Sequence, residues 1–256
     1  MQTTIHLLGH VLQANAVNIS VGHDPVVNWD SPDIDLTMAF KIKVLNSQID
    51  ITCELNRWSE DLLPHIYMRA FDLSRASVDV VAFAMESGLS VHLHTLIRPD
   101  GTSTPLLFND LRLPSLCSAY NLSEGFDEIH SMVLLSPNLF MAFNDLIQSI
   151  TLPHKSLVNC ARAIERIRNL ITPGKGKNKA ANKAAWVAMC DALRIDATYL
   201  KYITDHSKAP RHGESSHTPG DITNEVVARS WSVMNRYLEY RKAGGVLPSS
   251  LPQLTG

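Results

Sequence analysis

The chain has 256 residues, of which 45% are hydrophobic and 19% are charged, and its formal net charge is -2 at pH 7. This length allows one large domain or two smaller ones with a substantial core. The near-neutral charge excludes a surface built throughout for nucleic acid, although it leaves room for a local basic patch.

The cysteines lie far apart, at positions 53, 117, 160 and 190, and form no CxxC pair. A tight zinc site or a dense set of disulfides is therefore not expected. No apolar run approaches the roughly 20 residues that cross a bilayer, and the first residues lack the pattern of a signal peptide. We expect a cytoplasmic protein that does not enter the membrane.

The first third of the chain predicts β structure. Hydrophobic and polar residues alternate from Asp33 to Val44, which is typical of a strand with one buried face. The turn Asn46-Ser47-Gln48 leads into a second alternating run, Ile49 to Leu55. The two runs predict a hairpin.

A long helix is predicted from about Asp61 to Ser87, where apolar residues recur at spacings of three and four. Residues 89–97 return to a strand pattern, and a turn at Pro99-Asp100-Gly101 predicts a short partner strand near 105–111. Residues 1–120 are therefore expected to form an α+β domain, a small antiparallel sheet with one long helix.

The rest of the chain predicts helices, the last of them from near Asp221 to about Lys242. We expect residues 121–243 to form a C-terminal helical bundle and the Gly- and Pro-rich residues 244–256 to be a flexible tail. The fold class is thus α+β. Four large apolar residues are expected to share the helical core: Leu157, Ile164, Trp186 and Trp231.

His92 and His94 alternate with Leu93 on the predicted strand 89–97, so both point to one face. A His-x-His pair can hold a metal ion only with a third ligand. His6, His10 and His130 are candidates, but nothing in the sequence brings them together. We therefore predict solvent-facing histidines, with no metal site and no cofactor.

The segment TPGKGKNKAANK resembles a phosphate-binding loop only superficially, because Asn178 follows Lys177 where a P-loop needs Ser or Thr. The segment is nevertheless basic, and lysines that meet a phosphate backbone release condensed counterions. It predicts either a solvated loop or a nucleic-acid contact. The lysines concerned are Lys175, Lys177, Lys179 and Lys183.

The stretch KAPRHGESSHTPGD places Arg211, His212 and His217 directly before the last predicted helix. A helix N-terminus favours anions, and an arginine fork can hold a phosphate with two hydrogen bonds. A histidine with a pKa near neutrality could exchange a proton with a ribose hydroxyl or a leaving oxygen. These are the groups that metal-independent RNA cleavage needs.

A helical unit with an arginine, a polar residue and a histidine before its last helix resembles the HEPN superfamily, whose active members are mostly ribonucleases of toxin, CRISPR and phage-defence systems. The resemblance covers about residues 137–242, and Arg211, His212 and His217 match the motif. It implies that Arg211 stabilises charge on the phosphorane, His217 acts as acid or base, and His212 orients the phosphate. It also implies a homodimer in which two motifs face each other.

Two functions remain open. The protein is a metal-independent ribonuclease or RNA-binding relative, or it is a non-catalytic protein whose α+β half binds a partner protein or small ligand and whose helical half mediates dimerisation. The first requires Arg211 and His217 to converge on one phosphate-sized position. The second is favoured if an internal carboxylate engages Arg211.

Overall fold

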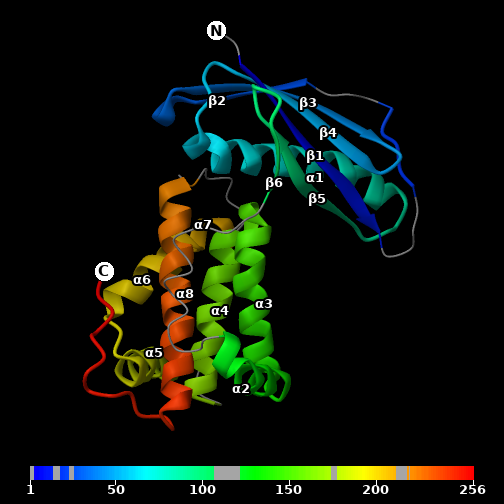
Figure 1. The fold of residues 1–256 in the computed structure, drawn as a ribbon. Helices are drawn as coiled ribbons and strands as arrows, with labels where there is room; N and C mark the ends of the chain where they lie inside the picture. The colour runs from blue at the N-terminus through cyan, green and yellow to red at the C-terminus, as the bar shows by residue number, and fades with distance from the viewer. Residues whose placement is uncertain are drawn as a thin grey trace. The chain divides into compact units, whose positions relative to one another are not determined.

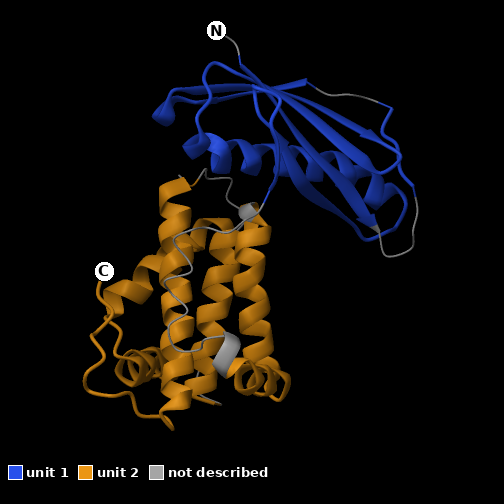
Figure 2. Cartoon of the chain, viewed as in Figure 1, with its two compact units in different colours: residues 1–107 blue, residues 108–256 orange. Residues whose placement is uncertain are grey.

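The computed structural model describes residues 3–13, 18–22, 26–106, 122–173, 178–211, 218 and 220–256. The chain divides into two compact units, residues 1–107 (unit 1) and residues 108–256 (unit 2), as Figure 2 shows. The domain boundary expected near residue 120 lies outside the described residues. The fold is α+β, as predicted.

Unit 1 is an antiparallel sheet of six strands in the order β2-β3-β4-β1-β5-β6 (Figure 1). A long helix, α1 (Leu63–Ala84), crosses one face, with the short 3-10 helix η2 (Glu60–Leu62) directly before it. The strands are β1 (Thr3–Gln13), β2 (Val26–Ser31), β3 (Leu36–Leu45), β4 (Gln48–Leu55), β5 (Leu89–Ile97) and β6 (Ser103–Pro105).

The predicted hairpin is confirmed as β3 and β4, which pair Val44 with Ile49. Asn46 and Ser47 form the two-residue turn and both have positive φ, 50° and 62°, the conformation that matches the twist of hairpin strands. The first strand of the hairpin begins later than predicted. Residues 32–34 form a 3-10 turn, η1 (Pro32–Ile34), that ends at Asp35 in the left-handed conformation.

The two faces of the sheet differ sharply. One face is apolar and packs against α1, burying Phe40 and Ile51 completely together with Ile66 of the helix. The opposite face carries exposed polar side chains, among them Lys41, Asp50 and Glu54, and no helix of the described part of unit 1 covers it. We call this second surface the open face.

Unit 2 is helical, and its core lies between α3, α4 and α8. The predicted core residues share one cluster: Leu157 and Ile164 are buried in it, and Trp186 and Trp231 are partly buried and pack against it. The described elements are α2 (Leu122–Leu134), α3 (Pro137–Thr151), η4 (Pro153–Lys155), α4 (Ser156–Ile171), α5 (Lys179–Leu193), α6 (Ala197–His206), α7 (Lys208–Arg211) and α8 (Gly220–Lys242).

Residues 244–256, which the sequence predicted to be a flexible tail, make specific contacts within unit 2. Leu254 pairs with Ile195 in a parallel bridge, and its backbone exchanges hydrogen bonds with Arg194 and Asp196. The guanidinium of Arg236, only 6% exposed, donates to the carbonyl oxygen of Pro252. The tail therefore completes the packing around α8. No helix within the described ranges is long and apolar enough to span a membrane.

Candidate functional site

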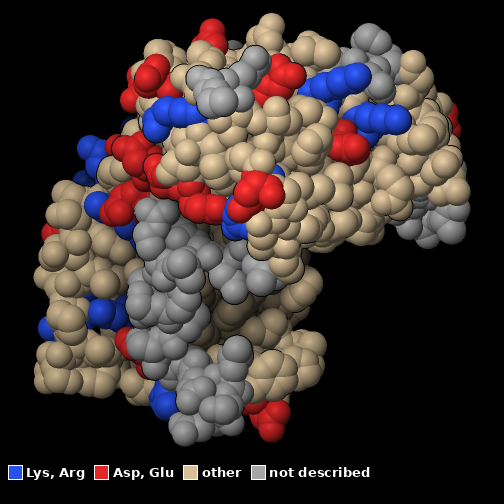
Figure 3. All heavy atoms as spheres, turned by 45° about the horizontal axis from the view of Figure 1, so that its top comes forward, with Lys and Arg blue, Asp and Glu red and all other residues tan. Residues whose placement is uncertain are grey.

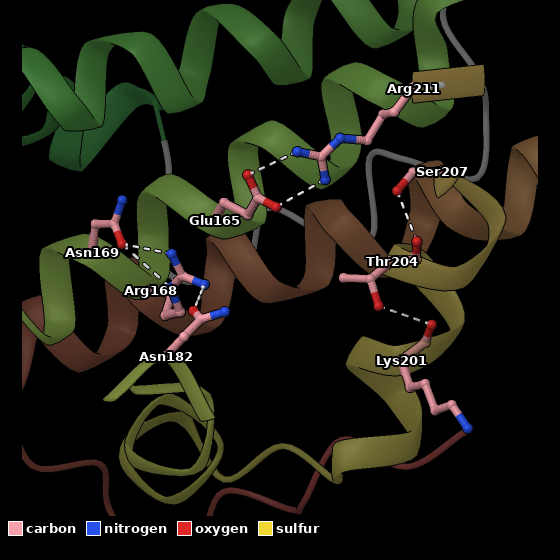
Figure 4. Close-up of polar contacts among 8 residues, drawn as sticks. All are labelled: Glu165, Arg168, Asn169, Asn182, Lys201, Thr204, Ser207 and Arg211. Carbon is pink, nitrogen blue, oxygen red and sulfur yellow. Dashed lines mark hydrogen bonds and ion pairs between the residues drawn. The ribbon is translucent and has the colours of Figure 1, made fainter. Parts of the chain in front are cut away.

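Arg211, the arginine of the predicted phosphate site, is held by a carboxylate of the same unit. It is the last residue of α7, and its two terminal nitrogens face the carboxylate of Glu165 on α4 at 2.9 and 3.4 Å. Figure 4 shows this bidentate ion pair. Both side chains are about one-third exposed, at 37% and 32%. One edge of the guanidinium, formed by its two terminal nitrogens, is thus engaged by a carboxylate.

The other members of the predicted site are placed only in part. His212, His217, Lys175 and Lys177 lie outside the described residues, so their approach to Arg211 stays a prediction. Lys179 and Lys183 are exposed on the first turns of α5, four residues apart and therefore on one side of the helix. Asp221 lies in the first turn of α8, where a carboxylate suits the positive end of the helix dipole.

Like Arg211, every described arginine of unit 2 has an interaction partner within the unit. Arg168 donates a hydrogen bond to Asn182 at 2.6 Å, and its guanidinium lies over the Trp186 ring at 4.8 Å. Burial lowers the pKa of Arg168, and the nearby charge of Glu165 partly offsets this shift. Figure 4 includes its contacts with Asn169 and Asn182. The complete set is Arg162, Arg166, Arg168, Arg194, Arg211, Arg229, Arg236 and Arg241.

Asp145 provides the most buried of these contacts. Its side chain on α3 is 1% exposed and faces Arg166 at 2.8 Å and Arg162 at 3.5 Å, both on α4. A carboxylate removed from water in this way needs charged partners to offset its lost hydration. The arginines of α4 therefore help to hold α3 against α4 rather than forming a free cationic surface.

The open face of unit 1 contains a shallow hollow of about 590 Å³ at the β2–β3–β4 end. Asp30 and Glu54 supply carboxylates, and Asn28, Thr37 and Asn56 supply amide and hydroxyl groups. The Asn56 side chain accepts a hydrogen bond from the Thr37 amide and donates to the carbonyl of Asp35. This side chain is therefore fixed in place at the rim of an acidic depression.

A cluster of three histidines lies further along the open face. His10 on β1 is directly opposite His92 on β5 in the strand register. The ring centroid of His10 is 5.4 Å from that of His92 and 5.0 Å from that of His94, and those of His92 and His94 are 6.0 Å apart. Strand pairing thus supplies the third histidine that the sequence alone could not locate.

A β-bulge sets this arrangement. The register of β1 and β5 shifts between Leu8 and Gly9, leaving His94 as the extra residue of β5. Burial, followed by the neighbouring His10 and His92, lowers the pKa of His94, and its Nδ1 lies 2.8 Å from the hydroxyl of Thr95. A low pKa favours the neutral ring at physiological pH.

The remaining candidate histidines lie elsewhere. His6 is near Thr52 and Asp50, at 3.3 and 3.8 Å, and His130 stacks on Phe126 in α2. His10 also lines a second hollow of about 470 Å³ together with Asn18, Asn46 and Gln48. As the side chains lie, no three His, Cys, Asp or Glu residues of the described ranges are arranged around one metal position.

The described cysteines are poorly suited to nucleophilic chemistry. Burial raises the pKa of the Cys53 thiol to about 12 and that of Cys160 to about 11. Burial also raises the pKa of Cys190, with smaller contributions from Asp191 and Asp196. Since the thiolate is the reactive form, these three residues remain protonated at neutral pH.

Comparisons with known proteins give a family without an assigned role. No curated protein and no solved structure matches the chain. Residues 9–107 match the model of the N-terminal domain of DUF8168, a domain of unknown function, and residues 126–242 match the model of its C-terminal domain. The two matched stretches correspond to unit 1 and to the helices of unit 2, so the chain carries both DUF8168 domains in order.

Proposed function

We propose that this protein is a non-catalytic binding protein whose open face receives a cationic ligand or a basic segment of a partner protein. The observation that favours a non-catalytic role is the ion pair between Arg211 and Glu165, which engages both terminal nitrogens of the guanidinium that would stabilise charge on a phosphorane. Separating a pair that is about one-third exposed costs only about 0.2–1 kcal/mol, so Glu165 weakens phosphate binding by Arg211 a few-fold.

The acidic hollow on the open face supports the binding half of the proposal. Asp30 and Glu54 come from strands separated only by β3, and amides of Asn28 and Asn56 line the same depression. Carboxylates with adjacent amide groups suit ammonium and guanidinium groups, which donate several hydrogen bonds at once. Lys and Arg side chains of a partner are the matching chemistry.

The charge of unit 1 is consistent with this assignment. Residues 1–107 contain 12 Asp and Glu but only 6 Lys and Arg. Acidic side chains form several groups on the molecular face drawn in Figure 3. A net negative surface attracts a cationic partner over roughly a Debye length, about 8 Å at physiological salt, and speeds its association.

Exposed apolar side chains on unit 2 support self-association of the helical half. Phe140 and Ile147 lie seven residues apart on α3 and are 53% and 51% exposed, so they share one side of the helix. Leu134 and Leu135 at the end of α2 are more exposed still. Exposed apolar side chains of this size favour contact with another protein surface.

RNA binding is the second candidate, and the charge of unit 2 favours it. Residues 108–256 contain 17 Lys and Arg against 13 Asp and Glu, and Lys179 and Lys183 are exposed on one side of α5. Should Arg211 leave Glu165 and meet His217, the chemistry would be metal-independent cleavage. Such an arrangement would support the ribonuclease function that the HEPN resemblance implies.

The test of the binding proposal uses a fluorescent lysine-rich peptide, with a glutamate-rich peptide as the negative probe. Exposed ion pairs contribute roughly 0.2–1 kcal/mol each, so the Asp30→Asn/Glu54→Gln variant is expected to bind the basic peptide several-fold to about tenfold more weakly. The matched control is Asp127→Asn/Glu128→Gln on α2, which changes the net charge equally. Equal loss in both variants would show non-specific attraction and refute a site in the hollow.

A parallel assay addresses RNA. Purified protein is incubated with mixed RNA in EDTA at low salt, beside the Arg211→Ala/His217→Ala variant. We expect no cleavage by either protein. Cleavage by the parent protein that the double substitution abolishes would overturn the non-catalytic proposal in favour of the second candidate.

A further inference from the structure

We propose that His10, His92 and His94 bind one divalent transition-metal ion, of which Zn²⁺ is the reference case, on the open face of unit 1. The three imidazoles come from two neighbouring strands and stand within ring contact of one another. The inference is independent of the acidic hollow, which lies at the β2–β3–β4 end of the same face.

The spacing of the rings fits three ligands of one ion. A zinc–nitrogen bond is about 2.0–2.1 Å long, so three imidazoles in tetrahedral positions place their ring centroids about 5 Å apart. The observed separations are 5.0, 5.4 and 6.0 Å. As the side chains lie, the described residues include no group of three such ligands that could hold a metal ion, so the proposed binding requires the three rings to rotate about their side-chain torsions.

The contact between His94 and Thr95 is compatible with metal binding through the other ring nitrogen. The Nδ1 of His94 lies 2.8 Å from the Thr95 hydroxyl. An Nδ1–H donated to that oxygen leaves Nε2 with a free lone pair, which is the usual arrangement of a metal-bound histidine. Imidazole nitrogen suits Zn²⁺, Cu²⁺ and Ni²⁺ better than Mg²⁺ or Ca²⁺, so the proposed ligand is a transition metal rather than a hard cation.

The backbone below the cluster is well suited to hold a site. β1 is paired on both sides, with β4 and with β5, and the bulge at Gly9 brings His94 beside His10. Ligands on paired strands are positioned more accurately than ligands on loops.

The test measures metal binding to the full chain without a histidine tag. Zn²⁺ is titrated calorimetrically, and Co²⁺ is followed by its visible absorption, which becomes intense in tetrahedral sites. We expect one ion per chain in both titrations. We expect each of His10→Gln, His92→Gln and His94→Gln to weaken Zn²⁺ binding at least tenfold and the triple variant to abolish the Co²⁺ band.

Two matched controls remove a histidine from outside the cluster, His6→Gln on the same face and His130→Gln in unit 2. Both are expected to bind the metal as the parent does. Far-ultraviolet circular dichroism confirms that each variant is folded, so loss of binding is not loss of structure. If the triple variant retains the parent's affinity, or if the parent shows no Co²⁺ band at millimolar metal, the proposal is wrong.

Discussion

Gly9 lies so close to His92 that a Cβ atom added at Gly9 would come within 2.3 Å of the His92 carbonyl oxygen. The approach occurs at the bulge between β1 and β5, where the register shifts. Any larger residue must push one strand from the other, because the obstructing atom belongs to the backbone. Glycine at this position is therefore a condition for the histidine cluster.

Gly9→Ala is expected to destabilise the protein by about 1–3 kcal/mol, the usual cost of overpacking a close contact. Urea unfolding measures the change. Gly88→Ala is the control, since an added Cβ there meets nothing within 4 Å. If Gly9→Ala and Gly88→Ala had the same free energy of unfolding, β1 and β5 would have accommodated the added Cβ atom at the bulge without a measurable loss of stability.

The ion pair between Glu165 and Arg211 is expected to contribute little to stability because both side chains are about one-third exposed. A double-mutant cycle with Glu165→Gln and Arg211→Ala should give a coupling of about 0.2–1 kcal/mol. Chemical denaturation of the four proteins supplies the values. A coupling near zero would mean that the pair contributes nothing measurable and does not oppose the binding of a phosphate to Arg211.

Asp145→Ala is expected to be more costly, by about 1.5–3 kcal/mol, because it removes a charged hydrogen-bond acceptor from a buried position. It also leaves Arg166, only 26% exposed, without its carboxylate. Thermal unfolding compares this variant with Asp127→Ala, which changes an exposed residue of α2. Similar melting temperatures would show that α3 and α4 do not depend on this contact.

Asp196 gives a pH-dependent prediction. Hydrogen bonds from the side chain and backbone of Thr198 lower the pKa of this carboxyl, which caps α6. A lowered folded-state pKa means that the stabilisation is present above the unfolded pKa and is lost as pH falls through the folded one. Asp196→Ala should therefore lower the melting temperature at pH 7 and have a smaller effect near pH 2.

The conservative substitution Asp196→Asn serves as the control, since asparagine caps helices without a charge. It should retain much of the stability at pH 7 and show less dependence on pH. A difference between Asp196→Ala and the parent that stays constant from pH 7 to pH 2 would argue against the carboxylate as the source.

Self-association through α3 predicts that Phe140→Asp/Ile147→Asp lowers the molar mass measured by light scattering after gel filtration. The charged residues would have to be desolvated in an apolar interface, which is unfavourable. Val80→Asp/Phe83→Asp on α1 is the matched control, because those residues are 71% and 88% exposed in unit 1. A monomeric parent protein, or dissociation by the control alone, would contradict the assignment to α3.

Local patterns predicted much of the fold. The alternation that ends at Val44 and resumes at Ile49 reflects the pleat of one buried face, and spacings of three and four residues mark the helices. The start of β3 was missed because a 3-10 turn at Pro32 interrupts an alternation that looks continuous in the sequence. The contacts of Leu254 were missed because Gly and Pro indicate only that no helix continues.

The candidate sites depend on long-range pairing, which the sequence does not display. Glu165 and Arg211 are 46 positions apart, and only the placement of α7 beside α4 joins them. The place of His10 on the open face was not evident from the sequence, because the neighbouring residues on that face, Leu8 and Leu12, are apolar too. Its approach to His94 could not be predicted either, because it requires both the β1–β5 register and the bulge.

The contacts of the C-terminal residues have a practical consequence for isolating unit 2. The stretch that matches the DUF8168 C-terminal domain ends at residue 242, but the acceptors of Arg194 and Arg236 come from Pro248, Ser249 and Pro252. Expression of a fragment cut at residue 242 would remove both carbonyl acceptors of Arg194, leave Arg236 with the carbonyl of Leu193 but not that of Pro252, and uncover Ile195. A fragment extended through Leu254 keeps the Ile195–Leu254 bridge and the hydrogen bonds of Arg194 and Arg236 to residues 248–252. It is therefore the better choice for biochemical work.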